Sequence, residues 1–305
     1  MPLDPQSQSV LDFLWSIGFP KIDQCSVDDA RAALAAIAEG SPPGPSMASV
    51  HDLDADGVPV RAYTPEGAGV KPVIVYFLPG GWVTGTIAGS DAYCRLIADL
   101  TGAVVVSVGY RLAPEHPFPA AVDDSVTAAT WVSRQAARLG ADPERLVLWG
   151  DSSGANLAAV VARKARDSQA FAVAMQVLSH PVTDHDLRRP SYLLGDEGML
   201  ITRAAMVTFW DYYLPDVAQR GNPDASPLRA ESLAGLAPAY VLTSGCDPMR
   251  DEGLEYIARL REDGVDVSAM HFESQFHCFN LLAGALPAAT AAVDDAVAAV
   301  LRVVG

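Results

Sequence analysis

The chain has few cysteines, and their placement argues against a site built on paired thiols. Four occur among 305 residues, and no two of them form a C-x-x-C pair. Neither a zinc site nor a disulfide framework is therefore predicted, and a reducing cytoplasm is the expected location. The four positions are Cys25, Cys94, Cys246 and Cys278.

Basic residues and long apolar runs are also scarce. The 21 Lys and Arg residues face 37 Asp and Glu, which gives a formal net charge of −16. An acidic surface repels polyanions, so neither a nucleic-acid partner nor a membrane partner is predicted. No run of about 18 or more apolar residues could span a bilayer, and residues 1–5 lack the features of a signal peptide. The simplest role for the charge is solubility.

Short apolar runs that alternate with helical segments dominate the rest of the chain. Half of the residues are hydrophobic, enough for one large α/β domain with an appendage or for two smaller domains. Runs without polar alternation, separated by helices, indicate a mostly parallel sheet covered on both faces, with ligands at the carboxyl ends of the strands. The expected strands are 59–63, 73–77, 103–108, 145–149, 173–178, 239–243 and 267–271.

Two segments fall outside this alternation. Residues 1–45 contain two expected helices, 8–16 and 27–39, and end in a proline-rich breaker. Residues 185–222 are rich in aromatic and bulky side chains and show no strand signal. We interpret both segments as a cap over the strand ends, flanking an α/β domain formed by 46–184 and 223–305, although ordinary core-packing helices are nearly as good an interpretation.

Residues 150–154 form a G-x-S-x-G pattern between the strand 145–149 and a helical segment that starts at Ala155. A strand, a sharp turn and a helix form the setting of a nucleophile elbow. The turn exposes the hydroxyl of Ser152, and the N-terminus of the helix offers partial positive charge beside it. Ser152 is therefore the candidate nucleophile.

A serine nucleophile needs a base and an acid, and both candidates follow expected strands. Asp247 comes after the strand 239–243, and His277 follows the strand 267–271. Taken singly, Asp247 could be a turn residue and His277 a loop histidine. Together with Ser152 they give the chain order serine, acid, histidine, which favours a catalytic triad.

Other candidates fit the triad less well. His271 lies inside an expected strand, which favours a structural role. Asp251 and Glu252 fall in the first turn of the next helix, where acidic residues stabilise the helix dipole. Four further histidines precede the acid in the chain and break the order: His51, His116, His180 and His185.

The sequence resembles the hormone-sensitive-lipase-like family of α/β-hydrolase esterases. The matching segments are 76–82, 110–115, 150–156, 247–253 and the surroundings of His277. The resemblance implies an α/β-hydrolase fold with an eight-stranded, mostly parallel sheet covered by helices on both faces, and a helical cap from the N-terminus and an insertion. It also implies ester hydrolysis without metal or cofactor, a small-molecule ester substrate and a homodimer.

The same resemblance assigns an oxyanion hole and reveals two departures. Its donors would be the backbone N–H groups of Gly80, Gly81 and Ser153. Leu78-Pro79 replaces the His-Gly that the family usually shows before these glycines, and Cys278 replaces its usual glycine after the histidine. The change at 78–79 is either neutral, in a loop that proline keeps rigid, or a sign of an altered acyl pocket or reaction.

Three functions remain open at this point. The first is a serine carboxylesterase that hydrolyses short- to medium-chain acyl esters through an acyl-enzyme. The second is a biosynthetic deacetylase, cyclase or acyltransferase with the same triad. The third, a non-catalytic small-molecule binding protein, is less favoured because all three triad residues are present.

Overall fold

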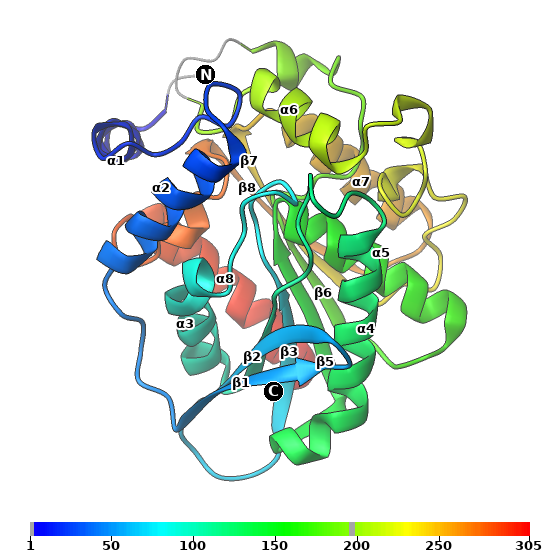
Figure 1. Ribbon diagram of the computed structural model, residues 1–305. Helices are drawn as coiled ribbons and strands as arrows, with labels where there is room; N and C mark the ends of the chain where they lie inside the picture. The colour runs from blue at the N-terminus through cyan, green and yellow to red at the C-terminus, as the bar shows by residue number, and fades with distance from the viewer. Residues whose placement is uncertain (1–2, 195–198) are drawn as a thin grey trace.

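The computed structural model describes residues 3–194 and 199–305 and has one eight-stranded sheet in the order β1-β2-β4-β3-β5-β6-β7-β8 (Figure 1). Pairing is antiparallel between β1 and β2 and between β2 and β4, and parallel elsewhere. This confirms the mostly parallel sheet. The strands are β1 Ser49–Ala55, β2 Val58–Thr64, β3 Lys71–Phe77, β4 Val104–Val108, β5 Ala141–Asp151, β6 Met175–Ser179, β7 Ala239–Cys246 and β8 Val267–Phe276.

Helices cover both faces of the sheet, as the sequence predicts. α3 and α8 pack together on one face, whereas α4, α5 and α7 lie on the other (Figure 1). The α-helices are α1 Pro5–Ser16, α2 Val27–Gly40, α3 Asp91–Thr101, α4 Ala120–Gln135, α5 Ser153–Ser168, α6 Arg203–Tyr213, α7 Arg250–Glu262 and α8 Pro287–Val304. Short 3-10 helices are η1 Ala88–Ser90, η2 Ala136–Leu139, η3 Pro190–Leu193, η4 Val217–Gln219, η5 Pro227–Arg229 and η6 Phe279–Leu282.

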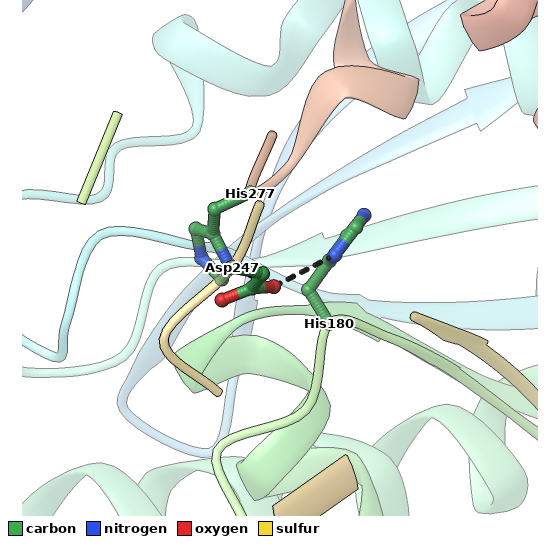
Figure 2. A group of neighbouring side chains, drawn as sticks. All are labelled: His180, Asp247 and His277. Atoms are coloured by element: carbon green, nitrogen blue, oxygen red, sulfur yellow. Dashed lines mark hydrogen bonds and ion pairs between the residues drawn. The ribbon is translucent and has the colours of Figure 1, made fainter. Parts of the chain in front are cut away.

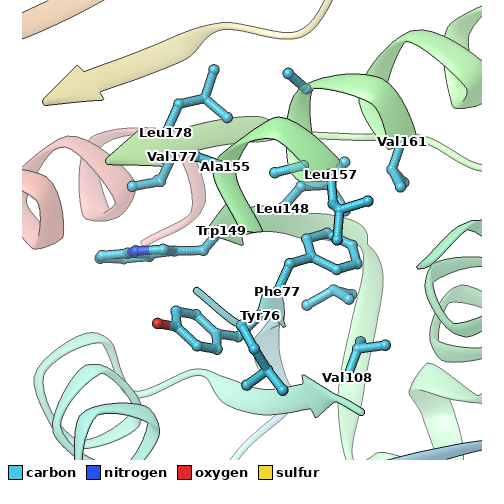
Figure 3. Close-up of a cluster of buried hydrophobic side chains, with 14 of the residues drawn as sticks. Tyr76, Phe77, Val108, Leu148, Trp149, Ala155, Leu157, Val161, Val177 and Leu178 are labelled. Carbon is cyan, nitrogen blue, oxygen red and sulfur yellow. The ribbon is translucent and has the colours of Figure 1, made fainter. Parts of the chain in front are cut away.

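The central strands are apolar because both of their faces are buried. Tyr76 and Phe77 of β3 and Trp149 of β5 are fully buried in the core cluster, and Figure 3 shows Leu157 of α5 beside Phe77. This packing fixes the ends of β3 and β5 relative to the start of α5. The strand ends that carry the candidate site therefore stand on a tightly packed core.

β1 is not among the strands predicted from the sequence. Its residues His51 and Asp52 are exposed, and the strand lies at the edge of the sheet, so it has no apolar run. α4 ends at Gln135, and the chain continues directly as η2.

α1, α2 and α6 lie beyond the end of the sheet where the parallel strands finish (Figure 1). α1 begins at the cap Asp4, and α2 begins at the cap Ser26, whose hydroxyl accepts from Asp29 N. Residues 1–2 and 195–198 of the two segments predicted to form a cap lie outside the described residues. Among the described helices, none is long and apolar enough to cross a membrane.

Candidate active site

The turn at Ser152 joins β5 to α5 and holds the serine in an unusual backbone conformation. Its φ is 58° and its ψ is −119°, a combination that L-residues rarely adopt. Both flanking glycines are needed for close packing: a Cβ at Gly150 would overlap the backbone of Gly154, and a Cβ at Gly154 would overlap the carbonyl oxygen of Phe77. The structure thus contains the strand–turn–helix that the sequence predicts.

Ser152, His277 and Asp247 form a continuous chain of hydrogen bonds. His277 Nε2 lies 2.9 Å from Ser152 Oγ, and His277 Nδ1 lies 2.8 Å from Asp247 Oδ2. Ser152 follows β5, Asp247 follows β7 and His277 follows β8, so the side chains come from the ends of three strands at one edge of the sheet. All three side chains are buried.

The electrostatics of Asp247 fix the direction of these hydrogen bonds. Burial alone would raise the pKa of Asp247, but the charge of His277 and hydrogen bonds from His180 and His277 outweigh it and hold the pKa below its usual value. An ionised carboxylate only accepts hydrogen bonds, so the proton of neutral His277 lies on Nδ1. Its Nε2 is then free to accept the proton of Ser152.

The loop after β3 carries Gly80 and Gly81, both with positive φ. The Gly80 carbonyl accepts from Val83 N at 3.0 Å and from Thr84 N at 2.9 Å, which coils the loop tightly. Within residues 3–194 and 199–305, the N–H groups of the two glycines donate to no backbone or side-chain acceptor. A Cβ at Gly81 would overlap the ring of Phe209 on α6, so this helix lies directly against the loop.

Leu78 and Pro79 are braced without the histidine that the family usually has there. Leu78 is buried, and its carbonyl accepts from the Tyr110 hydroxyl at 2.7 Å. The Pro79 carbonyl fits against Gly85, where a Cβ would overlap it. The loop is therefore held by Tyr110 and by close backbone packing.

The segment 110–115 that carries the resemblance makes further ties around this loop. Ala113 N donates to the Trp82 carbonyl at 2.9 Å. Arg111 pairs with Asp124 of α4 at 2.7 Å, and Glu115 pairs with Arg31 of α2 at 2.7 Å. These contacts are structural, and none reaches the triad residues.

His180 contacts the candidate acid Asp247, although its position before Asp247 in the chain excluded it as the predicted catalytic base. Its Nδ1 lies 3.0 Å from Asp247 Oδ2, so one carboxylate oxygen faces two histidines (Figure 2). Among the described residues, His180, Asp247 and His277 are also the group whose donor atoms could hold a metal ion, all within 4.8 Å of one another. Hydrogen bonds already account for that spacing. The feature of the sequence that could have placed His180 at the site is that it, like Asp247, directly follows a strand.

Two buried carboxyl groups beside the site were not recognised from the sequence. Burial raises the pKa of Asp151, next to the nucleophile, to about 6 despite hydrogen bonds from Asn280 and Tyr76. Glu252 is fully buried, and burial raises its pKa well above the usual value.

Glu252 lies in the first turn of α7, as the sequence predicts, but the hydrogen-bond partners of its carboxyl group lie outside that helix. Its carboxyl group accepts from Thr183 N at 2.8 Å and from the Tyr192 hydroxyl at 3.0 Å. Asp251 also has a partner outside the helix, because it accepts from Ser191 N at 2.8 Å. Both residues thus bind α7 to the 181–193 region.

Comparison with known proteins shows the family to which this chain belongs. Residues 74–281 match the protein-family model of the alpha/beta hydrolase fold. The carboxylic ester hydrolase LipN of Mycobacterium tuberculosis is 39% identical over 292 residues, which cover 91% of this chain and 77% of that protein. The chain belongs to the hormone-sensitive-lipase-like esterases of the α/β-hydrolase fold.

Two further relatives of the esterase are also named as ester-hydrolysing enzymes. The ethyl acetate hydrolase of Pseudomonas putida is 36% identical over 235 residues, which cover 76% of the esterase and 74% of that protein. The crystallised hyperthermophilic esterase from the archaeon Pyrobaculum calidifontis superposes with a TM-score of 0.92 at 35% identity, over 99% of each chain. The esterase is thus a serine ester hydrolase, as the sequence resemblance implies.

Proposed function

We propose that the protein is a serine carboxylesterase that hydrolyses short- to medium-chain acyl esters through Ser152, His277 and Asp247. The observation that carries this proposal is the unbroken hydrogen-bond chain from Asp247 through His277 to the Ser152 hydroxyl. A relative that its name describes as an ethyl acetate hydrolase supports small esters as substrates. The scarcity of cysteine supports a cytoplasmic location, and the homodimer stays a prediction.

In this mechanism His277 Nε2 takes the proton of Ser152 as the serine oxygen attacks the ester carbonyl carbon. The imidazolium that forms is stabilised by the ionised Asp247. It then protonates the leaving alcohol, and the acyl group remains on Ser152. A water molecule, activated by the same histidine, attacks the acyl-enzyme and releases the carboxylic acid, which restores the serine.

The negative oxygen of each tetrahedral intermediate needs N–H donors that are in place before the reaction. We propose the backbone N–H groups of Gly80, Gly81 and Ser153 for this role. The first two have no acceptor in the described chain, and the third lies at the N-terminus of α5, where the helix dipole favours negative charge. The elbow glycine Gly154 packs on the Phe77 carbonyl, which links the elbow to this loop.

We further propose that residues 1–45 and 185–222 form a cap that limits the size of the acyl group. Phe209 of α6 lies on the Gly81 loop, and Trp82 of that loop stacks on Tyr213 at 4.1 Å between ring centroids. Ser152 is only 7% exposed. Bulky aromatic groups packed on this loop would leave room for short acyl chains and disfavour long ones.

A series of p-nitrophenyl esters of increasing acyl length tests this function. We expect rapid turnover of acetyl to hexanoyl esters and little turnover of the palmitoyl ester, because Phe209 of α6 lies against the loop of the proposed oxyanion donors. The same series on Leu78→His/Pro79→Gly shows whether the unusual loop sets that preference.

No turnover of any simple ester, with labelling of Ser152 by a fluorophosphonate, would favour the deacetylase, cyclase or acyltransferase alternative, which Leu78-Pro79 motivates. If the protein neither hydrolyses an ester nor is labelled at Ser152, the result would support a non-catalytic binding protein.

Gly81→Ala is expected to lower kcat by about 100- to 1,000-fold, the usual effect of losing one oxyanion donor. The added methyl group would collide with the Phe209 ring and push the loop out of position. Phe209→Ala removes the obstacle, so the double variant should recover much of the loss in p-nitrophenyl acetate assays. If Phe209→Ala gives no recovery, the loop is not displaced by this contact.

A further inference from the structure

His180 is held as tightly as a triad member. It directly follows β6, its N–H donates to the Leu242 carbonyl at 2.8 Å, and its φ is 49°. The side chain is completely buried. Its ring packs edge-on against His277, 5.3 Å between centroids, and against Phe279, 5.6 Å away. In this packed environment Nδ1 lies 3.0 Å from Asp247 Oδ2 (Figure 2) and 3.3 Å from the hydroxyl oxygen of Ser244.

The chemistry of the pair determines which way the hydrogen bond runs. Burial lowers the pKa of His180 against the opposing effect of Asp247, so the ring is neutral and carries one proton. Ionised Asp247 can only accept, so that proton lies on Nδ1 and is donated to Oδ2. His180 Nε2 has no partner in the described chain, which agrees with this tautomer, since a lone pair is easier to leave unpaired than an N–H.

Both histidines therefore donate to the same oxygen of Asp247, and the acid is held from two sides. Met249 N donates to the other oxygen, Oδ1, at 2.8 Å. With three donors the carboxylate cannot rotate without breaking a buried hydrogen bond. The loss of any one donor would loosen the group that orients His277.

We propose that His180 is a positioning residue of the esterase, which fixes the Asp247 carboxylate so that His277 keeps the tautomer and orientation needed to deprotonate Ser152. This inference rests on the proposed catalytic roles of Ser152, His277 and Asp247. His180 reaches the serine only through Asp247 and His277, so its effect belongs to kcat and not to substrate binding.

A pair of replacements separates the hydrogen bond from the shape of the side chain. His180→Asn places an amide N–H near the position of Nδ1 and tolerates the left-handed backbone, whereas His180→Leu has a similar branched shape and no donor. With p-nitrophenyl acetate, His180→Leu should lose about ten- to a hundredfold in kcat, as expected for one hydrogen bond to a charged group. KM should stay unchanged, and His180→Asn should recover most of the rate.

The Leu variant also strains the backbone, so the comparison is repeated in an Asp247→Ala background. A positioning effect vanishes there because no carboxylate remains to be held, whereas a loss through general destabilisation persists. Equal losses in the two backgrounds, or equal losses in the Asn and Leu variants, would overturn the proposal.

A measurement that needs no ester turnover keeps this inference apart from the proposed function. In nitrogen-15 histidine NMR spectra of the whole protein we expect a hydrogen-bonded Nδ1 proton on His180 as well as on His277, and the first should disappear in His180→Leu. A His180 protonated only on Nε2 would refute the inference even if the protein hydrolyses esters. Failure of ester hydrolysis with the Nδ1 proton present would instead refute the proposed function.

Discussion

Ser152→Ala is expected to lower kcat for p-nitrophenyl acetate by about a millionfold, the loss seen when a serine hydrolase loses its nucleophile. The reason is geometric: Ser152 Oγ is the oxygen that His277 Nε2 contacts at 2.9 Å, and removing it leaves the base with nothing to deprotonate except water. The oxyanion donors remain, so a residual rate about 1,000- to 10,000-fold above that in water should survive.

The fold should survive this change, because the replacement removes only the hydroxyl oxygen of Ser152. The close packing at Gly150 and Gly154 stays unchanged. Ser168→Ala, the same replacement at the exposed end of α5, is the matched control and should keep the full rate. Melting temperatures of both variants show whether the protein stays folded. A folded Ser152→Ala protein with undiminished activity would refute the assignment of the nucleophile.

Asp247→Asn is expected to lower kcat by about 10,000-fold with little change in KM. The amide is neutral, so it no longer stabilises the imidazolium that forms on His277 during attack. Its NH2 group can also face His277 Nδ1 and force the proton onto Nε2, which then cannot accept from Ser152. The presence of His180 strengthens this expectation, since two imidazole donors compete for the single amide oxygen.

Asp251→Asn is the control for this prediction. Asp251 lies four residues further along and receives a hydrogen bond from Ser191 N, away from the triad residues. Its replacement should leave kcat within about twofold of the parent, as for most substitutions that leave the reacting groups untouched. An equal loss in both variants would show that general disturbance of this region, and not the acid, explains the effect.

The fold was predictable because the central strands are apolar along their whole length, so that their positions could be read directly. The edge strand β1 was missed because it exposes polar residues such as His51 and Asp52. The meeting of Ser152, Asp247 and His277 was predictable for a related reason: each follows a strand of a parallel sheet, and such ends share one edge.

Contacts that depend on packing between distant segments could not be predicted. His180 also follows a strand, but chain order tests only whether a histidine can be the base, and not whether it can hold the acid. The sequence indicated only a first-turn position for Glu252, because nothing in its sequence neighbourhood reveals that the region 183–192 covers it. The placement of Phe209 on Gly81 depends on how α6 crosses the loop, which no local pattern specifies.

The proposed mechanism requires a covalent acyl intermediate at Ser152. The most direct test mixes the protein with a slowly hydrolysed p-nitrophenyl ester, quenches the reaction in acid during the first turnover and locates the acyl group by peptide mass spectrometry. We predict one acyl group per chain, carried by the peptide that contains Ser152, with a burst of p-nitrophenol of the same stoichiometry. Full ester turnover with no acylated peptide, or with the acyl group on another residue, would contradict the account.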